Sequence, residues 1–393
     1  MNIIIVCRFP FPNGYSGTNR IISYSRGLIE LGNKVKVLII NRTENKNNIK
    51  NKKPKGIYND IEFEYISENI VKPNSKIRKA LFLLQDFIKS YMRLIKLSKE
   101  LPIDILLISS DLCYDVFLFS SLKKSKFINK VFWIVDEYPA PIRYGGKSIS
   151  FISLFLYKLS LKKINGLISM TKAVRDFYKK ISDFNFPSLI MPMTVEPERF
   201  IYSRDNQQNL KIITYIGNLE IYKDSLDILI EAFSLFYRER TDYKLWLVGE
   251  GKDMQILKHK VDQMRLSDYI VFLGSKTREE IEKILSLSNI LVLSRTKNKR
   301  SEGGFPTKLG EYLASGKPVI ITNVGEISDY LTDKVNAFIV EPNNIEAFAN
   351  CLLYVANHYD EAIKVGLEGK KLTESVFNYK TQAIRMYEFF KEV

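Results

Sequence analysis

The sequence predicts an α/β protein made of two doubly wound, Rossmann-like domains. In both halves short apolar strands alternate with amphipathic helices, and glycine-containing loops follow several of the strands. At 393 residues the chain is long enough for two domains of ordinary size, each with its own core. A content of 46% hydrophobic and 12% aromatic residues excludes a disordered chain.

The first domain is predicted to cover residues 1–192. It begins with the strand Ile3–Cys7, a loop with two glycines, a helix over about 18–31 and the strand Lys34–Ile40. Residues 41–56 are rich in Asn and Lys without periodicity and predict a mobile loop. Residues 57–66 alternate like a strand or hairpin, and later strands are expected at 103–109, 130–135, 166–170 and 188–191, with a helix at 171–181.

Acidic residues follow two of these strands, Asp111 after the first and Asp136-Glu137 after the second. Because ligands of doubly wound sheets bind beyond the carboxyl ends of strands, we expect these acids in a ligand-binding cleft. The alternative is that Asp136 and Glu137 cap the helix that starts near Pro139.

The predicted helix over 75–99 is basic on one face and apolar on the other, and a second basic, aromatic helix is expected at 148–163. Such a helix lies against acidic lipid or packs on the sheet with a solvated basic face. Residues 1–190 carry 32 Lys and Arg against 15 Asp and Glu, whereas residues 191–393 carry 27 against 29. The first half therefore suits an anionic membrane or a polyanionic substrate, or it is simply solvated. Without a nucleic-acid motif, we expect no nucleic-acid partner.

The start of the chain lacks basic residues, and Pro10 and Pro12 interrupt its apolar run, so we expect neither a signal peptide nor a membrane span. The three cysteines are far apart and lack metal-ligand spacing, which indicates reduced core residues: Cys7, Cys113 and Cys351. These features predict a cytoplasmic protein, either soluble or peripheral to the membrane.

The second domain is predicted over residues 210–374, after a linker that ends in the polar run 203–209. Strands are expected at 211–215, 243–249, 271–274 and 289–293, and a helix at 225–238. Thr277 and Glu280 have the spacing of a capping box. Residues 375–393 predict an amphipathic terminal helix.

The stretch from Ser301 to Ile320 predicts a flexible glycine loop, a helix capped by Thr307, a stop at Gly316 and a strand. Glycines directly before a helix start let the backbone approach an anion, so the stretch indicates a phosphate site. Glu311 would lie one turn inside this helix, where its carboxylate can accept two sugar hydroxyls. Glu302 could reach a second sugar from the loop.

This stretch resembles the donor-site signature of retaining glycosyltransferase family 4, whose members have the two-domain GT-B fold. The matching residues are Glu302, Gly304, Phe305, Pro306, Lys308, Glu311, Tyr312, Ala314, Gly316, Pro318 and Val319. Eight residues separate Glu302 from Glu311 where the family usually has seven, so Glu311 is the safer assignment. The resemblance implies two domains that face each other across a cleft, with the terminal helix crossing back to the first.

The resemblance further implies donor contacts in four loops. The expected donor-binding residues are Gly217, Asn218, Lys223, Gly249, Gly274, Ser275, Arg295, Glu302, Gly303, Gly304, Phe305, Pro306, Thr307, Lys308 and Glu311. Lys223 matches the family's diphosphate-binding lysine, but Asn218 stands where an arginine is expected. We expect the missing cation from one of Arg295, Lys297, Lys299, Arg300 or Lys308. The first glycine loop, with Gly14, Tyr15, Ser16 and Gly17, resembles the acceptor loop, although a plain turn is the alternative.

The predicted activity is a retaining, metal-independent transfer from a nucleotide-sugar to a glycan or lipid-diphosphate-sugar acceptor, in bacterial surface polysaccharide synthesis. The chain has no Asp-x-Asp motif for a metal, so that Lys223 is expected to stabilise the leaving diphosphate while Glu302 holds the transferred sugar. In many relatives the loop after the strand that corresponds to 130–135 carries a histidine that contacts the transferred sugar. The first half of this chain has no histidine, and Asp136 or Glu137 is the expected substitute. A catalytically silent GT-B subunit and a sugar-nucleotide epimerase are the alternatives.

Overall fold

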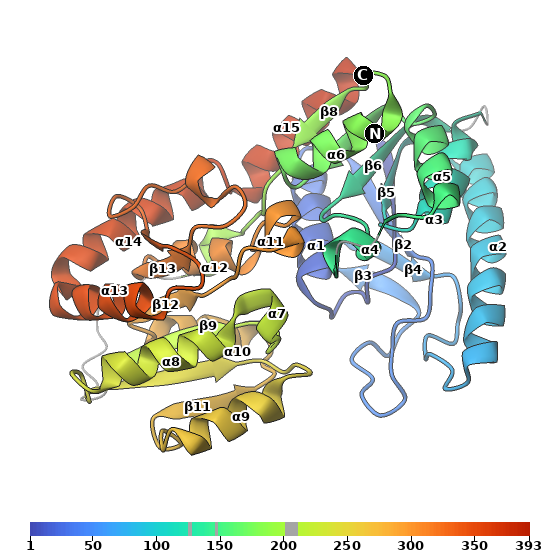
Figure 1. Cartoon of the computed structure of the whole chain (residues 1–393). Helices are drawn as coiled ribbons and strands as arrows, with labels where there is room; N and C mark the ends of the chain where they lie inside the picture. Colours follow the sequence, from blue (N-terminus) through green and yellow to red (C-terminus); the bar gives the residue numbers. More distant parts are fainter. Residues whose placement is uncertain (125–127, 146–147, 201–210) are drawn as a thin grey trace. The chain divides into compact units, whose positions relative to one another are not determined.

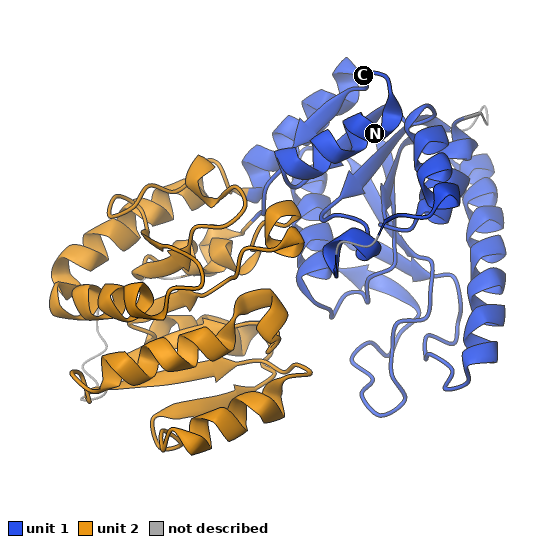
Figure 2. Cartoon of the chain, viewed as in Figure 1, with its two compact units in different colours: residues 1–194, 379–393 blue, residues 195–378 orange. Residues whose placement is uncertain are grey.

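The computed structural model describes residues 1–124, 128–145, 148–200 and 211–393, so the predicted polar run 203–209 lies outside the described residues. The chain divides into two compact units (Figure 2). Unit 1 comprises Met1–Thr194 and Tyr379–Val393, and unit 2 comprises Val195–Asn378. No helix within the described ranges is long and apolar enough to cross a membrane.

Unit 1 is built on an eight-stranded sheet in the order β3-β4-β2-β1-β5-β6-β7-β8 (Figure 1). All neighbouring strands are parallel except the β3–β4 hairpin. The strands are β1 (Asn2–Cys7), β2 (Lys34–Ile39), β3 (Lys55–Tyr58), β4 (Ile61–Tyr65), β5 (Ile103–Ser109), β6 (Ile128–Val135), β7 (Gly166–Ser169) and β8 (Ser188–Ile190). Side chains of β1 alternate between two buried clusters, as expected for a sheet covered on both faces.

Helices cover both faces of this sheet. On one face α1 (Ser16–Glu30) packs with α15 (Tyr379–Glu392), whose Met386, Phe389 and Phe390 join the core. The other face is covered by α2 (Lys76–Glu100), α3 (Cys113–Ser121), α5 (Phe151–Leu161) and α6 (Lys172–Ser182). Two short helices lie in connecting segments, α4 (Ala140–Arg143) and the 3-10 turn η1 (Leu122–Lys124).

The segment predicted as a mobile loop is instead held by the buried carboxylate of Glu44. Glu44 Oε2 accepts from the amides of Lys50 at 2.7 Å and Asn51 at 3.2 Å, and its Oε1 accepts from Asn51 Nδ2 at 2.7 Å. Asn51 in turn bonds both the amide and the carbonyl of Asn13. This segment therefore supports the loop between β1 and α1.

Unit 2 is a six-stranded parallel sheet in the order β11-β10-β9-β12-β13-β14. Its strands are β9 (Lys211–Ile216), β10 (Tyr243–Val248), β11 (Ile270–Gly274), β12 (Ile290–Leu293), β13 (Val319–Thr322) and β14 (Phe338–Val340). The strand order reverses between β9 and β12, so this is the point where a doubly wound sheet opens a crevice for ligands.

The helices of unit 2 are α7 (Ile221–Asp224), α8 (Leu226–Tyr237), α9 (Met254–Gln263), α10 (Arg278–Leu287), α11 (Lys299–Gly303), α12 (Lys308–Ala314), α13 (Ile345–Asn357) and α14 (Tyr359–Glu374), with 3-10 turns η2 (Pro197–Arg199) and η3 (Ile327–Asp329). Helix α10 begins with the predicted capping box of Thr277 and Glu280. The α/β fold with two doubly wound sheets is confirmed.

Candidate active site

The loops that follow β9 and β12 converge at the switch point of the second sheet. A buried ion cluster links them: Lys308 Nζ lies 2.9 Å from Asp224 Oδ2 and 3.0 Å from the hydroxyl of Tyr215. The Tyr215 hydroxyl donates to the same carboxylate oxygen at 2.5 Å. The cluster ties the start of α12 to the end of β9 and to α7.

Gly217 is required by this cluster. A Cβ atom at Gly217 would lie 1.8 Å from Lys308 Nζ, so any side chain here would displace the ammonium group. Gly249 is restricted in the same way, because its φ is +135° and a Cβ would lie 1.8 Å from the carbonyl oxygen of Gly217. Close contacts within the site therefore explain why both predicted positions are glycine.

The cluster concentrates positive charge around a single carboxylate. Burial alone would raise the pKa of Asp224, but Lys308, Arg295 and Lys223 together hold it well below its usual range. Burial lowers the pKa of Lys308 to about 8, against the opposing attraction of Asp224. Three cations thus surround one buried anion, and the local excess of positive charge suits an anionic ligand.

Arg295 and Lys308 are the two candidates for the missing cation that lie in this cluster. Arg295 is buried, its Nη1 donates to the carbonyl of Gly304 at 3.2 Å, and its Nε lies 3.5 Å from Asp224 Oδ1. By contrast, Arg300 pairs with Glu220 at 3.1 Å and Lys299 pairs with Glu302 at 2.8 Å. The remaining candidate, Lys297, is exposed.

The predicted diphosphate-binding residues Lys223 and Asn218 lie in the segment that follows β9, Asn218 in the loop and Lys223 in α7. Lys223 is in the last turn of α7, partly buried, and its charge acts on both Asp224 and Lys308. Asn218 is exposed, and its carbonyl oxygen lies 3.0 Å from the Tyr215 hydroxyl. The loop therefore presents one cation and one neutral amide.

The predicted glycine loop at the start of the 301–320 stretch is partly helical, and only its residues 304–306 lie outside a helix. Asn298 caps a short helix by accepting from the amide of Ser301 at 2.9 Å, and α11 then runs through the buried Gly303. Glu302 lies on this helix and is partly exposed beside Lys299. A polar residue three positions before Ser301 was the signal for this helix.

The predicted cap at Thr307 is wrong. Thr307 already has helical backbone angles, φ −62° and ψ −31°, and its side chain makes no cap hydrogen bond. The preceding Phe305 packs against Tyr330 and Phe377 with ring centroids 5.3 and 5.9 Å apart, and Pro306 is buried. Phe305 and Pro306 therefore anchor the start of α12 in the core.

Glu311 lies one turn into α12, as predicted, but its charged neighbours were not predicted. Arg199 Nη1 lies 4.0 Å from Glu311 Oε1, and Arg199 also pairs with Glu282 at 2.7 Å. Burial raises the pKa of Glu311, while Arg199 and Arg278 oppose that rise. Arg278 in turn pairs with the buried Glu196 at 2.8 Å.

The loops after β10 and β11 lie next to this site along the same edge. The amide of Gly249 donates to the carbonyl of Gly274 at 2.9 Å, which joins the two loops. Gly274 has φ +68° with open space around it, and Ser275 is exposed. These two positions leave backbone accessible at the edge of the sheet.

The predicted residues of unit 1 form separate groups at the carboxyl edge of its sheet. Asp136 pairs with the buried Arg20, which also bonds the Tyr24 hydroxyl at 2.5 Å. Burial raises the pKa of Asp136 against the attraction of Arg20. Glu137 pairs with Arg143 at 2.7 Å.

Neither Asp136 nor Glu137 acts as the helix cap considered as an alternative, because Pro139 is the N-cap residue of α4 and no side chain caps this helix. The arginine partners were missed because Arg20 lies 116 residues before Asp136, on α1. Sequence spacing gives no signal for such a pair.

The two glycines of the predicted acceptor loop are explained by packing within the loop. A Cβ at Gly14 would lie 2.0 Å from Thr18 Oγ1, and a Cβ at Gly17 would lie 2.7 Å from the Phe9 ring. Between them Tyr15 is 73% exposed and Ser16 is exposed as the first residue of α1.

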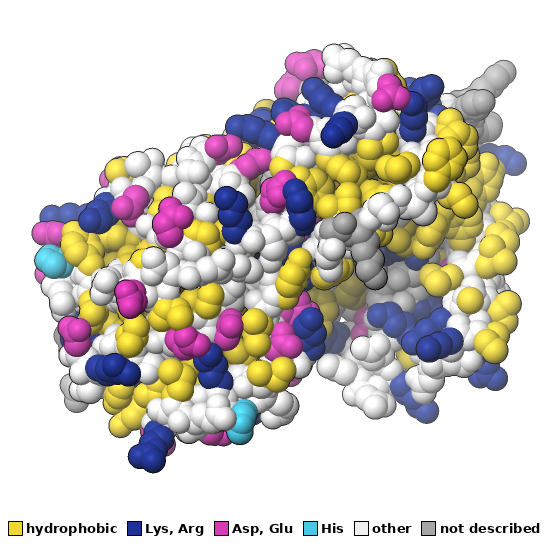
Figure 3. All heavy atoms as spheres, viewed as in Figure 1, with side chains coloured by type: hydrophobic (Ala, Val, Ile, Leu, Met, Phe, Trp, Pro, Cys, Tyr) yellow, Lys and Arg dark blue, Asp and Glu magenta, His cyan; other side chains and the backbone are white. Residues whose placement is uncertain are grey.

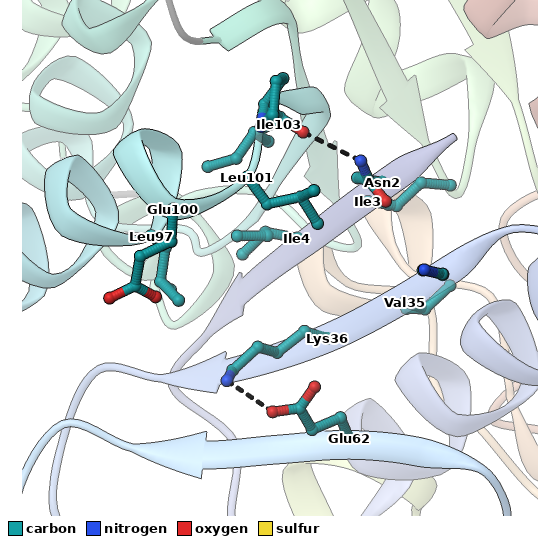
Figure 4. Close-up of a pocket in the computed structure, with 12 residues that line it drawn as sticks. Asn2, Ile3, Ile4, Val35, Lys36, Glu62, Leu97, Glu100, Leu101 and Ile103 are labelled. Atoms are coloured by element: carbon teal, nitrogen blue, oxygen red, sulfur yellow. Dashed lines mark hydrogen bonds and ion pairs between the residues drawn. The ribbon is translucent and has the colours of Figure 1, made fainter.

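One cavity lies away from all these residues, between the amino ends of β1, β2 and β5 and the end of α2 (Figure 4). It has a volume of about 300 Å³ and contains the ion pair of Lys36 and Glu62, 2.7 Å apart. Ligands of doubly wound sheets bind at the opposite edge, so this cavity adds no residue to the candidate site. Within the described ranges, no three His, Cys, Asp or Glu side chains gather in a way that could hold a metal ion.

Residues 198–371 match the family described as glycosyl transferases group 1. An uncharacterized glycosyltransferase of Haemophilus influenzae is 23% identical over 295 residues, which are 74% of this chain and 78% of the relative. The UDP-Gal:alpha-D-GlcNAc-diphosphoundecaprenol alpha-1,3-galactosyltransferase of Escherichia coli is 27% identical over 154 residues, which are 38% of each chain.

Among solved structures, Anabaena HepE in complex with UDP-glucose superposes with a TM-score of 0.75 at 13% identity, covering 100% of both chains. At this identity the likeness concerns the fold, and it agrees with the predicted GT-B architecture.

Proposed function

We propose that this chain, a glycosyltransferase of group 1 by its residues 198–371, transfers a hexose from a nucleotide-sugar with retention of configuration and without a metal ion. The observation that carries the proposal is the cation cluster of Lys308, Arg295 and Lys223 around Asp224 at the switch point of the second sheet. A sugar nucleotide brings two phosphate charges, and this cluster offers fixed positive charge to meet them.

Each donor contact has a proposed role. Lys223 and Lys308 neutralise the diphosphate, with the partly buried Gly217 beside Lys308, and Arg295 holds Asp224 and the Gly304 carbonyl in place. Glu311 accepts the ribose hydroxyls, and Arg199 and Arg278 favour its ionised form. Glu302 contacts the transferred sugar, and the loops at Gly249, Gly274 and Ser275 border the nucleotide.

The proposed reaction is attack on the same face from which the diphosphate leaves. The bond from the anomeric carbon to the acceptor oxygen forms as the bond to the phosphate oxygen breaks, and that phosphate oxygen takes the proton of the acceptor hydroxyl. Cations at the diphosphate stabilise the charge that develops on it. Asp136 is proposed as an auxiliary proton acceptor on the acceptor side, since its raised pKa suits that exchange.

The proposed acceptor is a glycan or a lipid-diphosphate-linked sugar used in bacterial surface polysaccharide synthesis. Its support is the E. coli relative, whose name includes a diphosphoundecaprenol acceptor, and the excess of basic residues in positions 1–190. The protein would then work in the cytoplasm, at the inner face of the membrane. The acceptor loop from Gly14 to Gly17 and the acids Asp136 and Glu137 are the proposed acceptor contacts.

A second candidate is a catalytically silent subunit of the same fold. The exposed Asn218, which replaces an expected arginine, favours it. Lys308 and Arg295 offset that loss, because both lie in the cluster around Asp224.

The test is a thermal-shift panel of UDP-, GDP- and ADP-sugars with EDTA present. We expect one nucleotide class to raise the melting temperature of the wild type, and Lys223→Gln to lose most of that shift. Transfer activity should fall by about 100- to 1,000-fold in that variant, as for other lost transition-state contacts.

A matched control is Lys364→Gln on α14, an exposed lysine outside the site. It should behave like the wild type in both assays. A panel with no stabilising nucleotide would contradict the donor site, and stabilisation without any transfer would favour the silent subunit.

A further inference from the structure

Helix α2 exposes many apolar residues in its first two thirds, although three of its four fully buried residues are polar. Its buried residues are Asp86, Ser90, Leu94 and Ser98. Asp86 Oδ2 lies 3.4 Å from Arg42 Nε, and the Ser90 hydroxyl donates to the Asp86 carbonyl at 2.6 Å. A helix that only covered a sheet would be expected to bury its apolar residues instead.

The outward side of α2 carries six large apolar residues that are between 47% and 74% exposed. They are Ile77, Leu81, Leu83, Leu84, Ile88 and Met92. Single exposed apolar residues are ordinary on protein surfaces, but so many on one helix indicate an interaction site.

Helix α5 extends this surface. Phe151, Ile152 and Phe155 are between 53% and 83% exposed. Helices α2, α3 and α5 cover the same face of the sheet through one core cluster, and the rings of Phe87 on α2 and Tyr114 on α3 lie 6.2 Å apart. We call these nine exposed residues of α2 and α5 the outer apolar surface. Figure 3 shows hydrophobic and basic side chains together on the side where α2 and α5 lie.

Basic residues border the outer apolar surface. The exposed ones are Lys76, Arg78, Lys79, Lys89, Lys96 and Lys99 on α2, and Lys162 just after α5. The only carboxylates of α2 are the buried Asp86 and Glu100, its last residue. A second copy of this chain would bring a like-charged surface, which disfavours self-association here. An anionic partner with an apolar interior fits both features.

We propose that the outer apolar surface inserts into the head-group region of a membrane that contains anionic lipids. The apolar side chains of α2 and α5 enter the acyl boundary while the flanking lysines contact lipid phosphates. Each lysine near such a surface favours binding by about fivefold. This proposal rests on the proposed function, which places the protein at the membrane, and it names the surface that makes the contact. Its test measures lipid binding and needs no transfer reaction.

The experiment is co-sedimentation of the full chain with vesicles of phosphatidylcholine alone or with added phosphatidylglycerol. We expect binding only to the anionic vesicles, weakened by salt. The variant Leu81→Gln/Leu84→Gln/Ile88→Gln should bind at least about tenfold more weakly, because three insertions are lost while helix propensity is kept. Phe151→Gln tests α5 independently and should also weaken binding.

The matched control is Ile256→Gln/Ile384→Gln, two residues 60% and 48% exposed on other helices, which should bind like the wild type. Equal binding of the wild type to both vesicle types, or to neither, overturns the proposal, as does a triple variant that binds normally. A dimer that the triple variant dissociates, seen by sedimentation equilibrium without vesicle binding, would assign the surface to a second copy. If no nucleotide-sugar stabilises the protein but it still binds anionic vesicles, only the donor site is rejected and the membrane proposal stands.

Discussion

Lys308 is a largely buried cation, and its burial keeps it close to losing its proton despite the attraction of Asp224. Its side chain is 14% exposed, and it touches one carboxylate and one hydroxyl. Burial lowers its pKa to about 8, so a bound diphosphate would restore the charged form. Donor binding and protonation of Lys308 should therefore be linked.

We expect the donor to bind less tightly as the pH rises from 7 to 9, because free Lys308 loses its proton near pH 8. Calorimetric titrations with the stabilising nucleotide measure this, and Lys308→Gln should remove the pH dependence. The stability of the fold should change in the opposite direction. Between about pH 8 and 10.5, the ordinary pKa of lysine, Lys308 is protonated in the unfolded chain but neutral in the folded one. Its contribution to the free energy of unfolding therefore rises as the pH increases through this range. If nucleotide affinity depended on pH in Lys308→Gln as it does in the wild type, Lys308 would not be the titrating group.

The sequence could predict site residues that belong to one contiguous motif. Glu311 lies in its predicted helix and Lys308 in the predicted donor stretch. Asp224 lies 84 positions before Lys308, and Arg199 and Arg278 lie 112 and 33 positions before Glu311. These neighbours could not be predicted, because each pair forms only through the fold.

Packing of α1 against α15 depends on the absence of a side chain at Gly27. A Cβ there would lie 2.5 Å from Ala383 Cβ and 3.1 Å from the Tyr379 carbonyl. Substituting alanine would normally stabilise a helix by about 1 kcal/mol. Here the contact is too short for both helices to remain in place, so overpacking should dominate.

Gly27→Ala should therefore lower the free energy of unfolding by about 1 to 3 kcal/mol in urea denaturation. Ala383→Gly alone should cost about 1 kcal/mol as a glycine within a helix. The double variant should lose less than the sum of the two, since the second change makes room for the new methyl group. Strict additivity would show that the two positions do not compete for space.

Most helices and strands could be predicted to within a few residues, because periodicity is a local property. Strand β5 has the predicted bounds, β1 begins one residue earlier than predicted, and α1 begins two residues earlier and ends one residue earlier. Where the predictions were wrong, a single polar side chain orders a segment whose overall composition suggested flexibility. Asn298 starts α11 in a stretch that glycines made look flexible, and Glu44 orders a segment whose composition suggested mobility.

The whole chain separates its tasks between two units. Unit 1 carries the excess of basic residues and the outer apolar surface, whereas unit 2 holds the cation cluster and the whole family match. Hydrogen exchange can test this division. The stabilising nucleotide should slow exchange of amides at 216–224 and 299–311, and a nucleoside without phosphates should protect only weakly. Slowed exchange confined to unit 1 would place donor binding elsewhere.

The last helix has a consequence for how the protein is made. Met386, Phe389 and Phe390 complete the core of unit 1, yet they are synthesised after all of unit 2. Unit 2 is continuous in sequence and can close while synthesis is still in progress. Unit 1 therefore starts before unit 2 but is completed after it, and a nascent chain stalled before residue 379 would leave part of one face of its sheet uncovered.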